Sequence, residues 1–143
     1  MYQLAPTLDT NIYASGDTLF SDGYTLLTGV PGPKEYLLQS FTVVDASDQG
    51  TDMTLLFMNE GFFIGTVNEA ISVDDTSAAK IMGSVNLAAS GATWLDLGGS
   101  KMITVVGCGL ILPAPIYVGA IILGTPTYAA TSLTFKFGLV PVR

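Results

Sequence analysis

Hydrophobic and polar residues alternate regularly near the C-terminus, over residues 132–139. A period of two places every second side chain on the same side of an extended backbone, so this stretch predicts a strand with one buried face. The polar positions are Ser132, Thr134, Lys136 and Gly138. The apolar positions are Leu133, Phe135, Phe137 and Leu139.

Residues 36–44 and 53–58 predict the two strands of a hairpin, joined by the polar loop 45–50. Regular alternation in the first strand assigns Leu37, Phe41 and Val43 to one face, and Tyr36, Leu38 and Val44 to the other. In the second strand Met53, Leu55 and Phe57 point one way, and Thr54, Leu56 and Met58 point the other. Both strands therefore carry apolar residues on both faces.

Further short apolar stretches, separated by Gly, Pro and Asp, predict strands at 11–20, 23–28, 85–89, 93–97, 101–106, 110–112 and 116–123. One short helix is expected over 76–82, capped by Asp74 or Asp75 and ended by Gly83. About nine short strands predict an all-β fold, an antiparallel β-sandwich or jelly-roll-like single domain. We expect it to span residues 11–143, preceded by an extended N-terminal arm, residues 1–10, that a neighbouring molecule orders.

The C-terminal third of the chain is almost free of charge, because no charged residue lies between Lys101 and Lys136. Such a segment predicts strands buried on both faces, in a core or against another subunit. Residues 102–123 are also long enough to cross a bilayer as a helix. Pro113 and Pro115 argue against that alternative, since they would remove hydrogen bonds that lipid cannot replace. We therefore expect two strands joined at 112–115, and no membrane association.

Charge is scarce in the whole chain and unevenly distributed. Charged residues make up 12% of the sequence, about half the usual share of roughly 25%. Residues 1–96 contain all twelve acids and two lysines, a net charge of −10, whereas residues 97–143 contain three basic residues. Low charge density indicates a surface that meets other protein, and the lack of clustered Lys and Arg excludes direct binding to nucleic acid.

Candidate chemistry is sparse. The chain has no histidine, which excludes Ser-His-Asp, Cys-His and histidine–metal sites. The single cysteine, Cys108, cannot form an internal disulfide, which fits synthesis in a reducing cytosol, and it is interpreted as structural. The first residues do not form a signal peptide. We expect no catalytic or cofactor-binding residues, and therefore not an enzyme.

Two groups of polar residues admit a second interpretation. Asp45, Asp48 and Asp52 provide oxygen ligands of the kind that calcium prefers, but their spacing is not that of an EF-hand, and a solvated hairpin tip is the simpler interpretation. Whether they bind a cation stays open at this stage. Residues 98–101 contain Gly-Gly-Ser-Lys without the rest of a phosphate-binding loop, and they predict a turn.

Several segments together carry a resemblance to a known family. They are the hairpin Phe41-Thr42-Val43-Val44-Asp45 to Met53-Thr54-Leu55-Leu56-Phe57, the run Ala78-Ala79-Lys80-Ile81-Met82-Gly83, the turn Trp94-Leu95-Asp96-Leu97-Gly98-Gly99, and the stretch from Ile116-Tyr117-Val118-Gly119-Ala120-Ile121 to Leu133-Thr134-Phe135-Lys136-Phe137-Gly138. In these segments the chain resembles the small β-rich proteins of tailed bacteriophages, which include head decoration, or cement, proteins.

The resemblance implies a structural virion protein that binds the outer surface of an assembled capsid and stabilises it. Its partners would be the major capsid protein and further copies of itself, with a trimer favoured, and it would reside on the capsid surface after synthesis in the host cytoplasm. An alternative is a receptor- or glycan-binding module of a fibre or tail, with a shallow site formed by Trp94, Tyr117, Tyr128 and loop acids. A hydrolase with a carboxylate pair is the least supported alternative.

Overall fold

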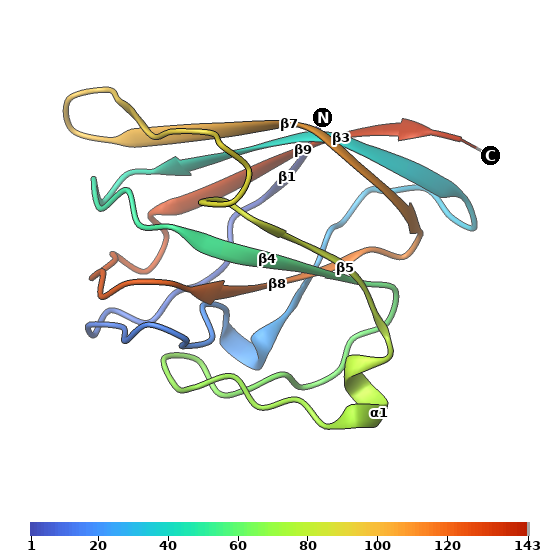
Figure 1. Cartoon of the computed structure of the whole chain (residues 1–143), viewed down its shortest axis with the longest axis horizontal. Helices are drawn as coiled ribbons and strands as arrows, with labels where there is room; N and C mark the ends of the chain where they lie inside the picture. The colour runs from blue at the N-terminus through green and yellow to red at the C-terminus, as the bar shows by residue number, and fades with distance from the viewer. Residues whose placement is uncertain (143) are drawn as a thin grey trace.

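The computed structural model describes residues 1–142, except for the side chain of Asp22, and consists of two antiparallel sheets packed face to face (Figure 1). The five-stranded sheet has the order β1-β9-β3-β7-β6. Its strands are β1 (Tyr2–Leu4), β3 (Glu35–Asp45), β6 (Leu95–Asp96), β7 (Lys101–Pro113) and β9 (Leu133–Pro141). The four-stranded sheet has the order β2-β8-β4-β5. Its strands are β2 (Thr25–Leu26), β4 (Met53–Met58), β5 (Ile81–Asn86) and β8 (Tyr117–Ile122).

The connectivity is that of a jelly roll. When the two-residue strand β6 is set aside, each sheet has four strands, and the chain crosses from one sheet to the other at every connection except that between β4 and β5. The first strand, β1, lies beside the last, β9. Eight strands arranged in this way in two sheets form the two Greek keys of a jelly roll. The all-β sandwich predicted from the sequence is therefore confirmed.

The main core fills the space between the two sheets, and aromatic rings link them. Phe57 of the four-stranded sheet meets Phe137 of the five-stranded sheet edge-on, with 6.0 Å between ring centroids. Phe41 lies beside Phe137 at 6.1 Å. Edge-to-face ring pairs add to the stabilisation from burial alone, and all three side chains are fully buried. The alternation predicted for β9 and β4 is confirmed at these positions.

The faces predicted for β3 are wrong at its N-terminal half, because a β-bulge interrupts the alternation. The pairing of β3 with β7 and β9 shifts between Leu38 and Ser40. Beyond this shift the inward positions change from even to odd residue numbers. As a result, the buried residues of the strand are Tyr36, Leu38, Phe41, Val43 and Asp45.

The same bulge joins two predicted strands into one. Leu38 pairs with Leu110 and Ser40 pairs with Val106, so residues 107–109 of β7 stand opposite Gln39 alone. Gly107 and Gly109 have φ angles of +68° and +73°, a region that glycine adopts without steric cost. Residues 101–106 and 110–112 are thus two halves of β7 and not separate strands.

The outer face of the four-stranded sheet is covered mainly by residues 59–73, while residues 9–24 run beside β8, where the backbone N–H of Leu19 donates to Ala120 and that of Ile122 donates to Asp17. We call these two segments the loop layer. They are joined by a parallel bridge between Thr18 and Val67 and an antiparallel bridge between Asp17 and Ala70. Beneath them Leu56, Met58 and Ile64 form a second, smaller apolar cluster. This cover explains why β4 and β8 carry apolar residues on both faces, as the sequence predicts.

The outer face of the five-stranded sheet has no such cover within residues 1–142. We call this surface the open face and define it by its outward-pointing side chains, which are Leu37, Thr42, Val44, Leu95, Met102, Thr104, Val106, Ile111, Thr134, Lys136 and Val140. In the single chain Val106 is 76% exposed and Ile111 is 49% exposed. The prediction that the uncharged C-terminal third is buried on both faces is therefore confirmed for β8 but not for β7.

The N-terminal segment lies along the sandwich. Strand β1 pairs with β9, and Leu4 and Leu8 are buried in the main core. The chain itself therefore provides contacts that order the segment predicted as an arm. Residues 11–20, predicted as a strand, form only isolated bridges.

The predicted helix is shorter than expected. Helix α1 covers only Asp75–Ala78, and the backbone N–H of Ser77 donates to the Asp74 side chain at 2.7 Å, which confirms Asp74 as the cap. The chain then enters β5 because residues 81–86 pair with β4. Gly83 does not end the helix but lies in this strand, where a Cβ would come within 3.0 Å of the Leu110 side chain.

Residues 102–123, weighed above as a membrane helix, form β7, a turn and most of β8. Among residues 1–142 no helix is long and apolar enough to span a bilayer.

Gly119→Ala tests the packing of the loop layer on β8. A Cβ at Gly119 would lie 2.9 Å from the carbonyl oxygen of Gly23 and 2.9 Å from Cδ1 of Ile64. We expect the free energy of unfolding, measured with urea, to fall by about 1–3 kcal/mol, the usual cost of overpacking. Gly99→Ala is the matched control, because a Cβ there meets no atom within 4 Å, and its stability is expected to stay close to that of the parent. Equal stabilities of the two variants would contradict this packing.

Candidate interaction surface

The open face contains two apolar rows that run across the strands. In the first row Leu37 pairs with Ile111 on one side and with Val140 on the other. In the second row Val44 pairs with Met102, which in turn pairs with Leu95 of β6. Because paired residues of antiparallel strands point to the same face, each row forms a continuous apolar band.

A polar strip separates the two rows and contains little charge. The hydroxyl groups of Thr42 and Thr104 form a hydrogen bond of 2.9 Å across β3 and β7. Lys136, which pairs with Thr42 and Gln3, is the charged side chain of this strip. Neutral hydroxyl groups that bond to one another lose little when water is displaced, so the open face is suited to contact with another protein.

The opposite side of the molecule is acidic. The loop layer and α1 carry Asp9, Glu60, Glu69, Asp74 and Asp75, and all five are at least partly exposed. Lys80 is the one basic residue in this part of the chain, and its Nζ lies 2.7 Å from Oε1 of Glu60. Figure 1 shows the two sides, with the five-stranded sheet at the top and α1 and the loops at the bottom. The molecule thus has a neutral side and an acidic side.

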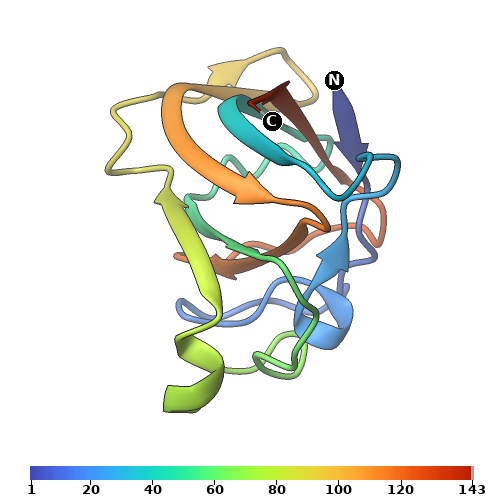
Figure 2. The same cartoon turned by 90° about the vertical axis from the view of Figure 1, so that its right-hand side faces the viewer.

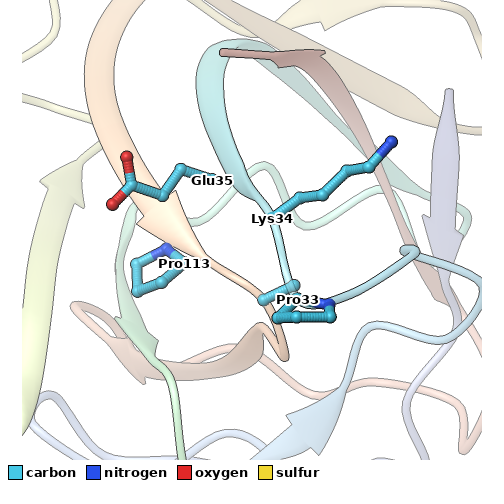
Figure 3. A pocket seen from close by; sticks show the side chains of 5 residues that line it. Pro33, Lys34, Glu35 and Pro113 are labelled. Atoms are coloured by element: carbon cyan, nitrogen blue, oxygen red, sulfur yellow. The ribbon is translucent and has the colours of Figure 1, made fainter. Parts of the chain in front are cut away.

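A pocket of about 430 Å³ lies where β3 begins and β7 ends. Its lining consists of Pro33, Lys34, Glu35, Pro113 and Ala114. Figure 3 shows the side chains of Lys34 and Glu35 pointing away from each other. Because its charged groups diverge, the pocket does not form an acid–base pair, and we interpret it as a groove at the border of the open face.

The three aspartates of the predicted hairpin tip have separate partners. Asp45 is fully buried and accepts hydrogen bonds of 2.8–3.0 Å from the backbone N–H groups of Ser47, Gln49 and Gly50. Asp48 forms an ion pair of 3.2 Å with Lys101. Among the side chains that the structure describes, which exclude that of Asp22, no three His, Cys, Asp or Glu residues cluster in a way that could hold a metal ion. The geometry assigns Asp45 to the stabilisation of the loop.

The three aromatic residues proposed for a shallow binding site do not come together. Tyr128 is only 2% exposed. Tyr117 begins β8 and packs against Tyr24 in the loop layer, at 5.6 Å between ring centroids. Trp94 lies near the other end of β8, where its Nε1 donates to Asp52 at 3.4 Å and the carbonyl of Asp52 accepts from Leu123. A single site made of these residues is therefore not formed.

Cys108 is in a setting that suits packing and not nucleophilic chemistry. Its side chain packs against the main core, and burial raises the pKa of its thiol. A raised pKa lowers the fraction of reactive thiolate at neutral pH. Residues 98–101 form the predicted turn into β7, in which the N–H of Leu97 donates to the carbonyl of Ser100 at 2.8 Å.

The open face was not predicted from the sequence, although two of the features that lead to it, the uncharged stretch and the glycines around Cys108, can be seen there. Ile111 and Val106 belong to the uncharged stretch, but the pattern does not show which way they point. Their direction depends on the bulge at residues 107–109. The pair of glycines around Cys108 was the available signal, since glycines inside a strand often mark a bulge.

Comparison of the chain with protein-family models, with curated proteins and with solved structures finds no match in any of the three.

Asp45→Asn tests the structural assignment of the buried carboxylate. An asparagine amide would place N–H donors against backbone N–H groups, so we expect the free energy of unfolding to fall by about 1–3 kcal/mol. Asp48→Asn removes an exposed ion pair and is the control, with an expected loss below about 1 kcal/mol. Urea unfolding measures both. If calcium stabilises the parent protein and not the Asp45 variant, the three aspartates form a cation site and the assignment is wrong.

Buried tyrosines make the fold sensitive to alkali. Burial raises the pKa of Tyr13 from 10.0 to about 12, and it also raises the pKa of Tyr128. The folded state then holds more protons than the unfolded state above pH 10, so stability is full below that pH and falls as the pH rises toward 12. Tyrosinate absorbance should show fewer than six tyrosines titrating near pH 10 before unfolding. Six titrating together in the folded protein would contradict this burial.

Proposed function

We propose that the protein is an accessory structural protein that attaches to the outer surface of an assembled viral capsid and stabilises it. The open face is the observation that carries this proposal. It presents apolar rows and hydroxyl groups on a rigid sheet, and opposite it lies a side that is rich in acids. A protein of this kind binds by burying a surface and needs no catalytic group.

The polarity of the molecule favours one orientation on the shell. The neutral open face would lie against the capsid, where burial of Ile111, Val106 and Val140 removes exposed apolar area from water. The acids of the loop layer would face solvent and keep neighbouring particles apart. An ordinary interface of roughly 800 Å² per partner is within the size of one face of such a sheet.

The fold agrees with this class of function by analogy only. Jelly rolls are common in viral capsid and lectin domains, but the same architecture serves unrelated functions. Within the lectin-like alternative, Trp94, Tyr117 and Tyr128 would have to form one site, and they lie apart. The structural role is therefore the better supported of the two.

In this proposal the partners are the major capsid protein and further copies of the chain. The protein would be made in the host cytoplasm and would join the virion after the shell has formed. Capsids with and without it, compared by heating and by osmotic shock, provide the first test. Equal resistance in both kinds of particle would refute a stabilising role.

Substitutions on the two sides of the molecule test the orientation. Leu95→Lys combined with Val140→Lys places two charges on the open face, at residues that are 56% and 41% exposed in the free protein. We expect binding to shells assembled without the protein, measured by co-sedimentation, to weaken at least tenfold, since each buried charge costs more than about 1.4 kcal/mol.

The matched control makes the same change on the acidic side. Ile12→Lys combined with Phe63→Lys replaces two exposed apolar residues of the loop layer. This variant is expected to bind shells as the parent does. Weaker binding of the control and normal binding of the open-face variant would reverse the proposed orientation.

A further inference from the structure

One edge of β7 has no partner strand over most of its length. On its inner side β7 pairs with β3 from Lys101 to Pro113. On its other side β6 pairs only with Lys101 and Met102. From Ile103 to Pro113, in the part of the chain that the structure describes, this second edge is not paired with any strand. Its outward backbone groups can accept and donate ladder hydrogen bonds to another extended segment.

Most edge strands are protected against such pairing, and between Met102 and Pro113 the bulge at residues 107–109 is the one feature of this kind in β7. Charged side chains, especially lysine, are the usual means, together with proline and short strand length. Between Met102 and Pro113 there is no charged residue, and the strand is 13 residues long. Val106 and Ile111 add exposed apolar area next to this edge. The edge is therefore able to pair with another strand.

The edge is complementary to itself. Ile103 and Val105 before the bulge point inward, as do Leu110 and Leu112 after it, while Val106 and Ile111 point outward. In antiparallel pairing of two β7 strands, Val106 can stand opposite Ile111 of the second copy, and Val105 opposite Leu112. Inward residues then meet inward residues, and outward residues meet outward ones, as a sheet requires.

The bulge makes this match possible. In a regular strand Val106 and Ile111, five positions apart, would point to opposite faces. The three residues 107–109, which stand opposite Gln39 alone, reverse the alternation once and place both side chains on the open face. A two-fold axis near Cys108 then relates the two halves of β7 to each other.

We propose that two copies of this chain associate edge to edge through antiparallel pairing of their β7 strands. The two five-stranded sheets then form one continuous sheet. The outer edge of β5 lies on the same side of the sandwich, as Figure 2 shows, so the four-stranded sheets also approach each other at this contact. An opening of about 320 Å³, lined by residues 84–86, 89–90 and 105–108, separates β5 and the loop that follows it from β7.

The contact is isologous, since the same strand contributes from both sides, and it therefore gives a closed dimer. It competes with the trimer that the sequence analysis favours, which needs a head-to-tail contact. Pairing also joins the two open faces side by side. The open faces of both copies can then contact the same surface of a larger partner. The pairing itself does not depend on the proposed function.

The mass of the free protein is the first measurement. Size-exclusion chromatography with light scattering, over a series of concentrations, is expected to give twice the mass of the 14.9 kDa chain. Val106→Lys places a charge at the centre of the paired edge, at a residue that is exposed in the single chain, and it is expected to raise the dissociation constant at least about tenfold. Val140→Lys, on β9 and away from the edge, is the matched control and should leave the dimer intact.

Cross-linking of the single cysteine tests the register. In this register Cys108 stands opposite Gly109 of the second copy, so the two Cys108 Cα atoms would be roughly 6 Å apart, which is within the range of a disulfide. A mild oxidant should therefore give a covalent dimer of the parent. In the control, Cys108→Ser combined with Thr76→Cys, the one cysteine lies on α1, and only slow collisional linkage is expected.

A monomeric or trimeric mass at all concentrations would overturn the proposal. So would a dimer that survives Val106→Lys and forms no Cys108 cross-link, because its contact would then lie elsewhere. All of these measurements use the free protein without capsids. Failure here leaves capsid binding through the open face untouched, and failure of capsid binding leaves the β7 pairing untouched.

Discussion

Strand β3 is hydrogen-bonded to β7 on one side and to β9 on the other, and a β-bulge at Gln39 determines which of its side chains face the core. Before Gln39, Tyr36 and Leu38 point into the core, and after it Phe41 and Val43 do so. The extra residues that allow the change lie in β7, at 107–109. The aromatic core, the apolar rows of the open face and the matched halves of the β7 edge all depend on this local irregularity.

The two sheets differ in what covers their outer faces. Both contain strands with apolar residues on the side away from the main core, and such residues must be covered or must bind a partner. The chain covers the four-stranded sheet with the loop layer, which places Leu56 and Met58 in a second cluster. It leaves the five-stranded sheet open. This difference gives the molecule its neutral and acidic sides.

Local pattern was sufficient for some elements and insufficient for others. The alternation of β9 and the capping by Asp74 follow from neighbouring residues, and the structure confirms them. The predicted hairpin of residues 36–44 and 53–58 is wrong, because β3 pairs with β7 and β9 in one sheet and β4 pairs with β5 and β8 in the other. The faces of β3 at Tyr36 and Leu38 could not be obtained in this way, because the bulge that sets them depends on pairing with residues about 70 positions away. The loop layer and the pairing of β1 with β9 are likewise long-range contacts. For the interaction surface, the low charge could be predicted from the sequence, but the direction of the side chains that form it could not.

The pairing of β1 with β9 places both ends of the chain on the five-stranded sheet, where Tyr2 stands opposite Phe137. Peptides fused to either end would emerge beside the surface that we propose for docking. The segment 59–73, which carries Glu60 and Glu69 on the acidic side, is a better place to insert a displayed epitope. Because β1 and β9 are neighbouring strands, a short linker could join them, and circular permutation would then carry new ends to the acidic side.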